Sequence, residues 1–291
     1  MRAFLVACVG VLIAGCAGTL MWSPVTILNA LALGPYHTET DISYGPGPRQ
    51  RLDVYIPRHA NGAPLVVFYY GGSWEFGKKS LYRFVGAALA SNGVVVVIPD
   101  YRLYPQTRFP GFLQDSAAAL AWAKAHAAGL GANPARLFVM GHSAGAYNAV
   151  MLALDPQWLA PFGLSPQQDI AGVIGLAGPY DFLPLTDPKL KMIFGPPDEL
   201  ARTQPINFVT RFAPPVFLAV GTTDTTVDPG NSARLAARLA QAGDEVTLKD
   251  YPGVDHRSLV GAISPLLGGI APVLPDCLAF IFRTPRPRRS A

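Results

Sequence analysis

Apolar runs and helical patterns alternate along most of the chain. Residues 52–56 alternate apolar and polar positions, which predicts a half-buried strand closed by Pro57. Residues 65–70 and 94–99 are continuous apolar runs, typical of strands buried on both faces of a sheet. Further strands are predicted at 137–140, 170–176, 216–220 and 246–251, and helices at 112–130, 144–154, 235–242 and 273–282. This alternation predicts an α/β fold, in which a mostly parallel sheet carries helices on both faces.

Two stretches lack such a pattern. Residues 17–48 become rich in turn-forming residues toward their end, so we expect a tether and entry segment there. Residues 181–215 are rich in proline and polar residues, which fits either a small cap over a site or a long surface excursion. The chain has 291 residues, of which 50% are hydrophobic, and this is enough for one sizeable core. We therefore expect a single folded domain over 49–283.

The first 16 residues are typical of an export signal. Met1-Arg2 gives a positive start, and the apolar run that follows to Ala14 is too short to span a membrane. The run ends in Ile13-Ala14-Gly15-Cys16, which resembles the lipobox of bacterial lipoproteins. In that motif the cysteine receives a diacylglyceryl group and becomes the mature N-terminus. The alternative is an uncleaved anchor from Phe4 to about Leu33, against which the polar and helix-breaking residues inside it argue.

Lipid attachment at Cys16 predicts a location and a partner. Ala17 follows instead of the aspartate associated with inner-membrane retention, which favours the outer membrane if the source is a diderm bacterium. The expected location is the cell envelope, through the lipid anchor, with export as the other outcome. Each buried methylene of an acyl chain contributes about 0.8 kcal/mol, so two or three chains hold a protein stably.

Charge and cysteine content exclude several other classes. The net charge of +4 is mild, and the basic cluster in the tail 284–291 and at Arg283 is typical of a solvated terminus. Nothing resembles a nucleic-acid module, so we expect no nucleic-acid partner. After loss of a leader, Cys277 has no obvious partner and no metal-ligand spacing remains. We therefore expect neither a metal nor a cofactor.

The strongest chemical signal is Gly141-His142-Ser143-Ala144-Gly145, between a predicted strand and a predicted helix. This context is the one that a nucleophile elbow needs, because the sharp turn exposes the serine Oγ. A side chain at either glycine is expected to collide with a neighbouring element. The N–H of Ala144 and the helix amino end then favour a developing oxyanion. The alternative interpretation is a glycine-rich turn without a catalytic role. The further motifs described below argue against it.

A second motif, Tyr70-Gly71-Gly72-Ser73-Trp74, follows the strand at 65–70. Two glycines at a strand end allow backbone N–H groups to converge on one point, as an oxyanion hole requires. We expect Gly72 and Ser73 to donate together with Ala144, and Gly71 to act as a hinge. An ordinary Gly-Gly turn fits these residues equally well when they are taken alone.

An acid and a base follow later strands. Asp224 lies just past the strand at 216–220, and His256 lies in the loop past the strand at 246–251. The order Ser143, Asp224, His256 is that of α/β-hydrolases, and all three lie at carboxyl ends of predicted parallel strands. His256 is expected to take the Ser143 proton, and Asp224 to orient the imidazole.

Other acids and histidines fit these roles less well. Asp228 is expected to open the following helix as a cap, and Asp255 cannot easily reach the ring of its own neighbour. His142 is too close to Ser143 in sequence to act as its base. The remaining histidines lie in a helix or in entry and loop segments, namely His126, His37 and His59.

Together these motifs resemble an α/β-hydrolase of the esterase/lipase type that carries a His-Gly-Gly-x-Trp oxyanion motif. The resemblance runs from about Gly45 to Ile281 and includes Asp100-Tyr101-Arg102, the helix with Asp115, and Gly178-Pro179-Tyr180-Asp181. Relatives include carboxylesterases, feruloyl-esterase-like enzymes, arylformamidases and isoprenylcysteine methylesterases. The resemblance implies an eight-stranded sheet with a small cap or none. Tyr70 departs from the family by replacing a histidine that supports the oxyanion loop, and the methylesterase branch lacks that histidine too.

The sequence therefore predicts a serine hydrolase that cleaves small carboxylic esters through an acyl-enzyme. An amidase of the arylformamidase type, using the same triad, is the alternative enzyme. A non-catalytic hydrolase-fold binding protein at the membrane is the alternative from another class, and the intact triad argues against it. The acyl group, the alcohol and the oligomeric state do not follow from the sequence.

Overall fold

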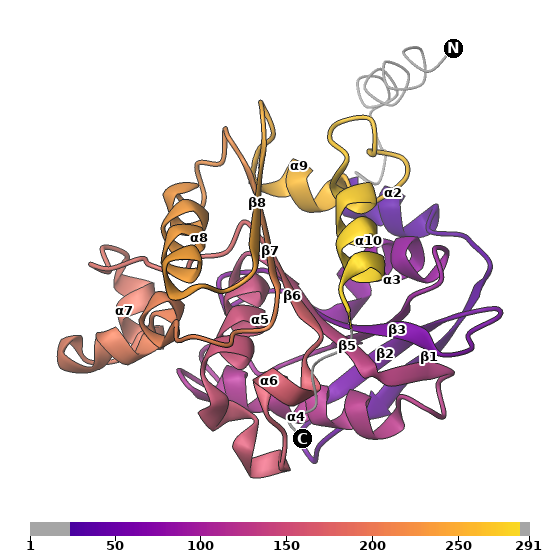
Figure 1. Ribbon diagram of the computed structural model, residues 1–291, viewed down its shortest axis with the longest axis horizontal. Helices are drawn as coiled ribbons and strands as arrows, with labels where there is room; N and C mark the ends of the chain where they lie inside the picture. The colour runs from indigo at the N-terminus through magenta and orange to yellow at the C-terminus, as the bar shows by residue number, and fades with distance from the viewer. Residues whose placement is uncertain (1–23, 286–291) are drawn as a thin grey trace, which may run out of the picture.

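An eight-stranded sheet forms the centre of the computed structural model, which describes residues 24–285 (Figure 1). The strand order is β1-β2-β4-β3-β5-β6-β7-β8, and β2 runs antiparallel to both of its neighbours while the strands from β4 to β8 pair in parallel. The predicted eight-stranded, mostly parallel sheet is confirmed. The strands are β1 (Tyr36–Ser43), β2 (Arg51–Pro57), β3 (Ala63–Tyr69), β4 (Val95–Pro99), β5 (Ala132–His142), β6 (Gly172–Leu176), β7 (Val216–Gly221) and β8 (Val246–Tyr251).

Helices cover both faces of this sheet. Helices α3 and α10 contact each other on one face, and α4 and α5 contact each other on the opposite face (Figure 1). Strands β3, β4, β6 and β7 between these layers are buried at every residue, which is why their sequences are continuous apolar runs. The α-helices are α2 (Pro24–Ala30), α3 (Arg83–Ala90), α4 (Gly111–His126), α5 (Ala144–Leu154), α6 (Pro166–Asp169), α7 (Pro188–Phe194), α8 (Gly230–Ala242), α9 (His256–Gly261) and α10 (Val273–Arg283).

The expected tether at 17–48 is wrong for its described part, because α2 and β1 lie there. Strand β1 pairs with β2 at the edge of the sheet, and most of its residues are exposed. Both faces of this edge strand are exposed to solvent, so its sequence does not alternate apolar and polar residues. The hydrophobic pattern therefore did not reveal it. Asp41 lies at a register shift in β1 with φ of 57°, and Lys79 Nζ lies 2.7 Å from both the Asp41 and the Asp53 carboxylates. This buried lysine fixes the irregular edge to β2.

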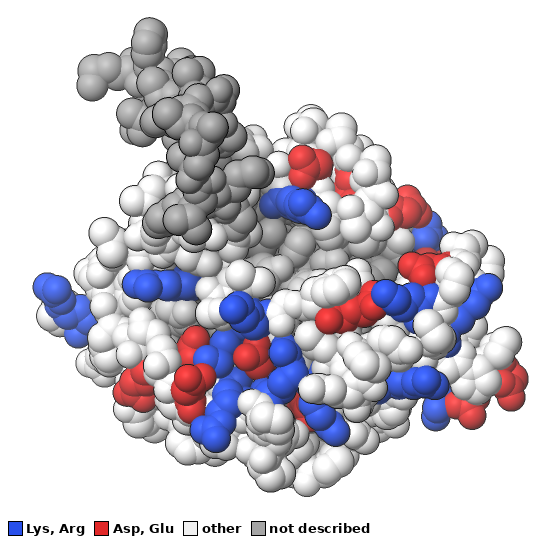
Figure 2. Space-filling model, turned by 180° about the vertical axis from the view of Figure 1, so that it is seen from behind, with Lys and Arg blue, Asp and Glu red and all other residues white. Residues whose placement is uncertain are grey.

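The ends of the chain complete the layout. The predicted signal segment 1–16, its Cys16 and most of the basic tail 284–291 lie outside the described residues. Between residues 24 and 285, no helix is both long enough and apolar enough to cross a membrane. Figure 2 shows basic and acidic side chains intermingled on one face of the molecule, without a continuous field of one sign there.

Residues 181–215 connect β6 to β7 along the chain, and we call this segment the cap. It contains α7 and the 3₁₀ helices η4 (Pro197–Thr203) and η5 (Pro205–Phe208). Tyr147 Oη of α5 donates a hydrogen bond of 2.8 Å to Thr203 O, and the backbone N–H groups of Tyr180 and Asp181 donate to Asn231 Oδ1. Hydrogen bonds therefore attach the cap to α5 and to the start of α8.

Candidate active site

Ser143 lies in a sharp turn between the end of β5 and the start of α5. Its backbone has φ of 57° and ψ of −124°, a conformation that is strained for a residue with a side chain. Added Cβ atoms at Gly141 and Gly145 lie only 2.1 Å from Gly145 O and 2.0 Å from Tyr69 O, so both positions require glycine. The Ser143 N–H donates to Leu176 O of β6 at 2.8 Å, which fixes the turn against the neighbouring strand. The local structure is thus a nucleophile elbow.

The structure brings the predicted acid and base into contact. His256 Nδ1 lies 2.7 Å from Asp224 Oδ2, and both residues are buried. The other carboxylate oxygen of Asp224 accepts from the N–H groups of Thr226 and Val227, at 2.8 and 2.9 Å. Because the second oxygen is occupied by these two donors, Asp224 accepts from His256 Nδ1–H, and the Nε2 atom of the ring is then the one able to accept a proton.

The rival acids have other partners. Asp228 Oδ1 accepts from Gly230 N at the start of α8, and Asp228 Oδ2 lies 3.3 Å from Arg234 Nη1. Asp255 caps α9 by accepting from the N–H groups of Arg257 and Ser258. Both carboxylates therefore stabilise helix starts, as a capping role predicts.

His142 has a function that sequence reasoning missed. Its Nε2 donates to the backbone carbonyl of His256 at 3.0 Å, and the two imidazole rings lie 4.6 Å apart. Burial, together with repulsion from a charged His256, lowers the pKa of His142 to about 3. The His142 ring therefore stays neutral and supports the backbone of His256. These residues are 114 positions apart, so no local pattern reveals the contact.

We expect His142 to make the folded protein sensitive to acid. Its pKa is about 6.5 in the unfolded chain and about 3 in the folded protein, so the unfolded chain binds more protons between these values. Above about pH 6.5 the His142 ring is neutral in both states and does not lower the free energy of unfolding. Below that pH the free energy of unfolding falls by at most about 1.4 kcal/mol per pH unit, until the pH reaches the folded-state pKa. His142→Gln keeps a donor near the Nε2 position but does not titrate. Urea unfolding from pH 7.5 to 4.5 should show a flatter decline for the variant, and parallel curves would contradict this.

The backbone after β3 forms the candidate oxyanion hole. Gly72, Ser73 and Trp74 have φ of 132°, 52° and 59°, and a Cβ on Gly72 would lie 2.3 Å from Phe76 O. In the described part of the chain, the N–H groups of Gly72, Ser73 and Ala144 have no hydrogen-bond partner. Ala144 is the first residue of α5, where N–H groups lack partners within the helix. Three donors are thus available beside the elbow.

Gly71 holds this loop close to the nucleophile without donating to it. A Cβ on Gly71 would lie 2.9 Å from Ser143 Cβ, so only glycine allows the approach. Its N–H faces the Tyr82 hydroxyl, where it opposes the burial that raises the pKa of Tyr82. Gly71 thus has a partner of its own for its N–H group, and the hinge role of Gly71 and the donor roles of Gly72 and Ser73 stay predictions.

Tyr70 supports the oxyanion loop with its hydroxyl. Tyr70 Oη donates to Asp100 Oδ1 at 2.8 Å and accepts from Arg49 Nη2 at 2.7 Å. Arg49 also donates to Gly77 O at 3.0 Å, on the far side of the loop. The Tyr70 ring stacks on Tyr101 with centroids 4.8 Å apart, and burial raises the pKa of Tyr70 far above its usual value. A neutral phenol between a carboxylate and a guanidinium thus lies where the resemblance in sequence implies a histidine.

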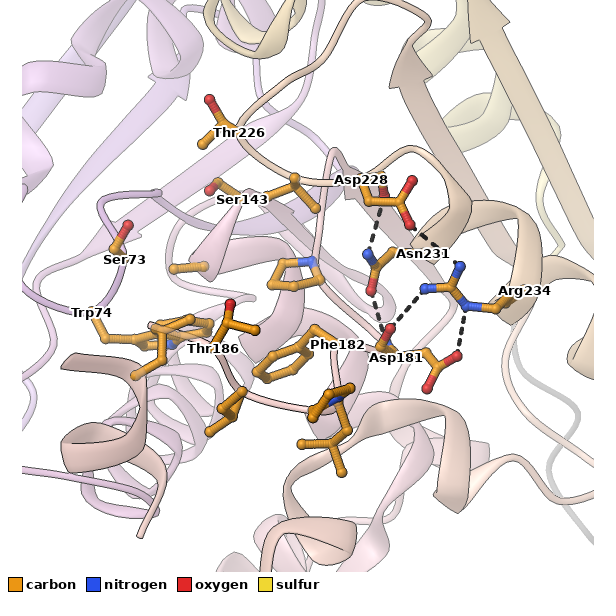
Figure 3. A pocket seen from close by; sticks show the side chains of 17 residues that line it. Ser73, Trp74, Ser143, Asp181, Phe182, Thr186, Thr226, Asp228, Asn231 and Arg234 are labelled. Atoms are coloured by element: carbon orange, nitrogen blue, oxygen red, sulfur yellow. Dashed lines mark hydrogen bonds and ion pairs between the residues drawn. The ribbon is translucent and has the colours of Figure 1, made fainter. Parts of the chain in front are cut away.

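A cavity of about 370 Å³ opens beside Ser143 (Figure 3). Ser73, Trp74 and Ser143 lie along one side of it, while Asp181, Asn231, Asp228 and Arg234 form a hydrogen-bonded network on the other side. Cap residues complete the wall, namely Phe182, Leu183, Pro184, Leu185, Thr186 and Leu190. Within residues 24–285, no cluster of three or more metal-ligating side chains is found.

Comparison of the sequence with known proteins identifies the family. A model of the BD-FAE family matches residues 52–239, more than half of the chain. The chain is 27% identical to a probable isoprenylcysteine alpha-carbonyl methylesterase of Arabidopsis thaliana, over 85% of this chain and 56% of that protein. It is 28% identical to Esterase LipC of Mycobacterium tuberculosis, over 79% of this chain and 62% of that protein. The chain thus spans less than two thirds of the length of these relatives.

Another relative matches over more of its own length. Kynurenine formamidase of Salmo salar is 29% identical, over 79% of this chain and 78% of that protein. Among solved structures, an esterase of Pyrobaculum calidifontis has a TM-score of 0.73 and 25% identity, covering 88% of this chain and 89% of that one. A truncated carbohydrate esterase from gut microbiota has a TM-score of 0.75 at 19% identity, covering 86% and 97%, and this likeness is one of fold. By family match and by fold, the chain belongs to the BD-FAE family and has the architecture of the α/β-hydrolase esterases.

Proposed function

We propose that this protein is a serine hydrolase that cleaves carboxylic esters through an acyl-enzyme. The observation that carries the proposal is the elbow of Ser143 beside three N–H groups without a partner among residues 24–285, with the buried Asp224–His256 pair on the same edge of the sheet. A nucleophile, an oriented base and preorganised donors are the three elements that acyl transfer needs. Relatives and structural neighbours named as esterases support the same reaction.

The reaction proceeds in two steps. Ser143 Oγ bonds to the ester carbonyl carbon while His256 takes its proton, and the N–H groups of Gly72, Ser73 and Ala144 stabilise the oxyanion. His256 then protonates the departing alcohol as the carbon–oxygen bond breaks. In the second step a water molecule gives a proton to His256 and attacks the acyl carbonyl. His256 then returns that proton to Ser143 Oγ as the acyl–oxygen bond breaks and the acid leaves.

Turnover of a short p-nitrophenyl ester tests this proposal directly. Purified protein should hydrolyse p-nitrophenyl acetate or butyrate, and a fluorophosphonate probe should label Ser143 and stop turnover. The labelled peptide is identified by mass spectrometry after digestion. Failure of both turnover and labelling in folded protein would support the non-catalytic binding protein instead.

An aryl formamidase is the second candidate, and the similarity to kynurenine formamidase favours it. The same triad attacks a formamide carbonyl, and His256 then protonates an amine instead of an alcohol. Comparing kcat/KM for a formanilide and for an aryl ester of similar size separates the two. A higher value for the formamide would assign the protein to the amidase class.

We also propose that the protein is held in the cell envelope by lipid at Cys16. The proposal is supported by the Ile13-Ala14-Gly15-Cys16 sequence after a short apolar run. Helix α2 begins at Pro24, and its Asn29 bonds to the carbonyls of Ser80 and Leu81. Seven residues, 17–23, lie between Cys16 and Pro24, and the eight Cα-to-Cα steps between these two positions span at most about 28 Å. The domain would thus lie close to the lipid headgroups.

Mass spectrometry of the mature N-terminus in a bacterial host tests the anchor. The wild type should begin at Cys16 with a diacylglyceryl group and sediment with membranes. Cys16→Ser should accumulate as unprocessed precursor, while Cys8→Ser, a matched control in the same leader, should be processed normally. A free Met1, or cleavage at another residue, would reject lipid attachment and favour the uncleaved anchor.

A further inference from the structure

Helix α7 of the cap touches the oxyanion loop through an ion pair. Lys189 Nζ lies 2.8 Å from Glu75 Oε1, two residues after Ser73. The Glu75 N–H donates to Gly72 O at 2.9 Å, which closes the turn that contains the candidate donors. The Glu75 side chain is 15% exposed and that of Lys189 is 48% exposed, so the carboxylate has limited access to other cations. The pair therefore joins the cap to the loop across 114 residues of sequence.

The loop conformation depends on contacts from outside the loop. Ser73 and Trp74 both have positive φ, which residues with side chains adopt only when their surroundings hold them there. Trp74 O accepts from Tyr104 N, and its indole N–H donates to Asn148 Oδ1 of α5. The indole also packs edge-on against Phe194 at the end of α7, with centroids 4.8 Å apart. Helix α7 thus contacts two consecutive residues of the loop.

The same helix forms part of the cavity wall. Leu190, the residue after Lys189, lines the cavity beside Ser143, as do the cap residues that precede α7. A shift of α7 therefore changes both the space for substrate and the position of Glu75. Since Gly72 and Ser73 must point at the oxyanion within fractions of an ångström, small displacements of the loop weaken transition-state binding more than substrate binding.

We propose that Lys189 is a positioning residue, which acts through Glu75 to hold the N–H groups of Gly72 and Ser73 in their productive orientation. This inference rests on the proposed ester hydrolysis and adds a structural link between the cap and the oxyanion hole. Lys189 itself touches no reacting atom. Loss of the pair is expected to reduce kcat and to leave KM nearly unchanged.

Lys189→Met tests the link, because methionine keeps the aliphatic stem and removes the charge. For p-nitrophenyl butyrate we expect kcat to fall about fivefold, the scale of a single partly exposed ion pair, with KM within about twofold. Lys189→Arg should restore most of kcat. Lys191→Met is the matched control on the same helix, since Lys191 has no ion-pair partner among the described residues, and it should match the wild type.

Three further measurements separate positioning from general stability. Glu75→Gln should lower kcat as much as Lys189→Met, and the double variant should be no worse than either single one, because all three remove the same interaction. At about 1 M salt the wild type should approach Lys189→Met, which should itself respond little. Thermal midpoints of the variants should lie close to that of the wild type.

Equal kcat in the wild type and Lys189→Met would overturn the positioning role. So would a raised KM at unchanged kcat, or additive losses in the double variant. Absence of ester turnover by the wild type would instead overturn the proposed function together with this inference, and the two failures are therefore distinguishable.

Discussion

Ser143→Ala should lower kcat for a short ester by a factor on the order of 10⁴ to 10⁶. Alanine removes the attacking oxygen and keeps the backbone, so the unusual φ and ψ of the elbow, its bond to Leu176 O and the donors of the oxyanion hole should persist. Substrate binding should change little, because the cavity wall is otherwise intact. Initial rates with p-nitrophenyl butyrate at saturating concentration measure the effect.

Ser165→Ala provides the control for this experiment, since Ser165 is the residue before α6 and does not line the cavity beside Ser143. It should retain wild-type kcat, and all three proteins should unfold at similar temperatures. More than a few per cent of residual activity in Ser143→Ala, after contamination is excluded by active-site labelling, would assign the nucleophile elsewhere.

Asp224→Asn should be the second most damaging change, with a loss in kcat on the order of 10³ to 10⁴. The asparagine oxygen can still accept from the N–H groups of Thr226 and Val227. Its amide NH₂ then faces His256 Nδ1, which favours the tautomer whose Nε2 carries a proton and cannot accept one from Ser143. The local fold is preserved while the base is inactivated.

Asp228→Asn is the matched comparison, four residues away on the same loop. Its side chain is 65% exposed, and the asparagine oxygen can still cap Gly230 N, so kcat should stay within about threefold of the wild type. Steady-state kinetics of both variants at pH 8 decide between them. The reverse ranking would move the catalytic acid to Asp228.

The sequence predicted those parts of the molecule that are marked by a pattern of neighbouring residues. Buried strands such as β3 and β4 are continuous apolar runs, and the elbow at Ser143 carries its glycines at fixed positions, so both are visible without the fold. Asp224 and His256 were found by their position after successive strands, and the structure places them 2.7 Å apart. The apolar runs and the elbow are local patterns, whereas Asp224 and His256 are 32 positions apart and were paired by the order of the strands that precede them.

Long-range contacts were not predictable in this way. Arg49, Tyr70 and Asp100 meet under the oxyanion loop although they come from three separate segments, and only the folded sheet brings them together. The bond from His142 to His256 O and the Glu75–Lys189 ion pair each join positions 114 residues apart. Strand β1 was missed for a different reason, since its solvated residues carry no apolar period.

The two outer strands also bear on how copies of the protein behave when they are crowded together. Strand β1 carries exposed His37 and Glu39 and is interrupted at Asp41, and β8 carries exposed Lys249 and Asp250. Charged side chains and a bulge oppose the addition of a further strand to an open sheet edge. Many copies confined to a small area should therefore remain separate particles and resist growth into sheet-linked fibres.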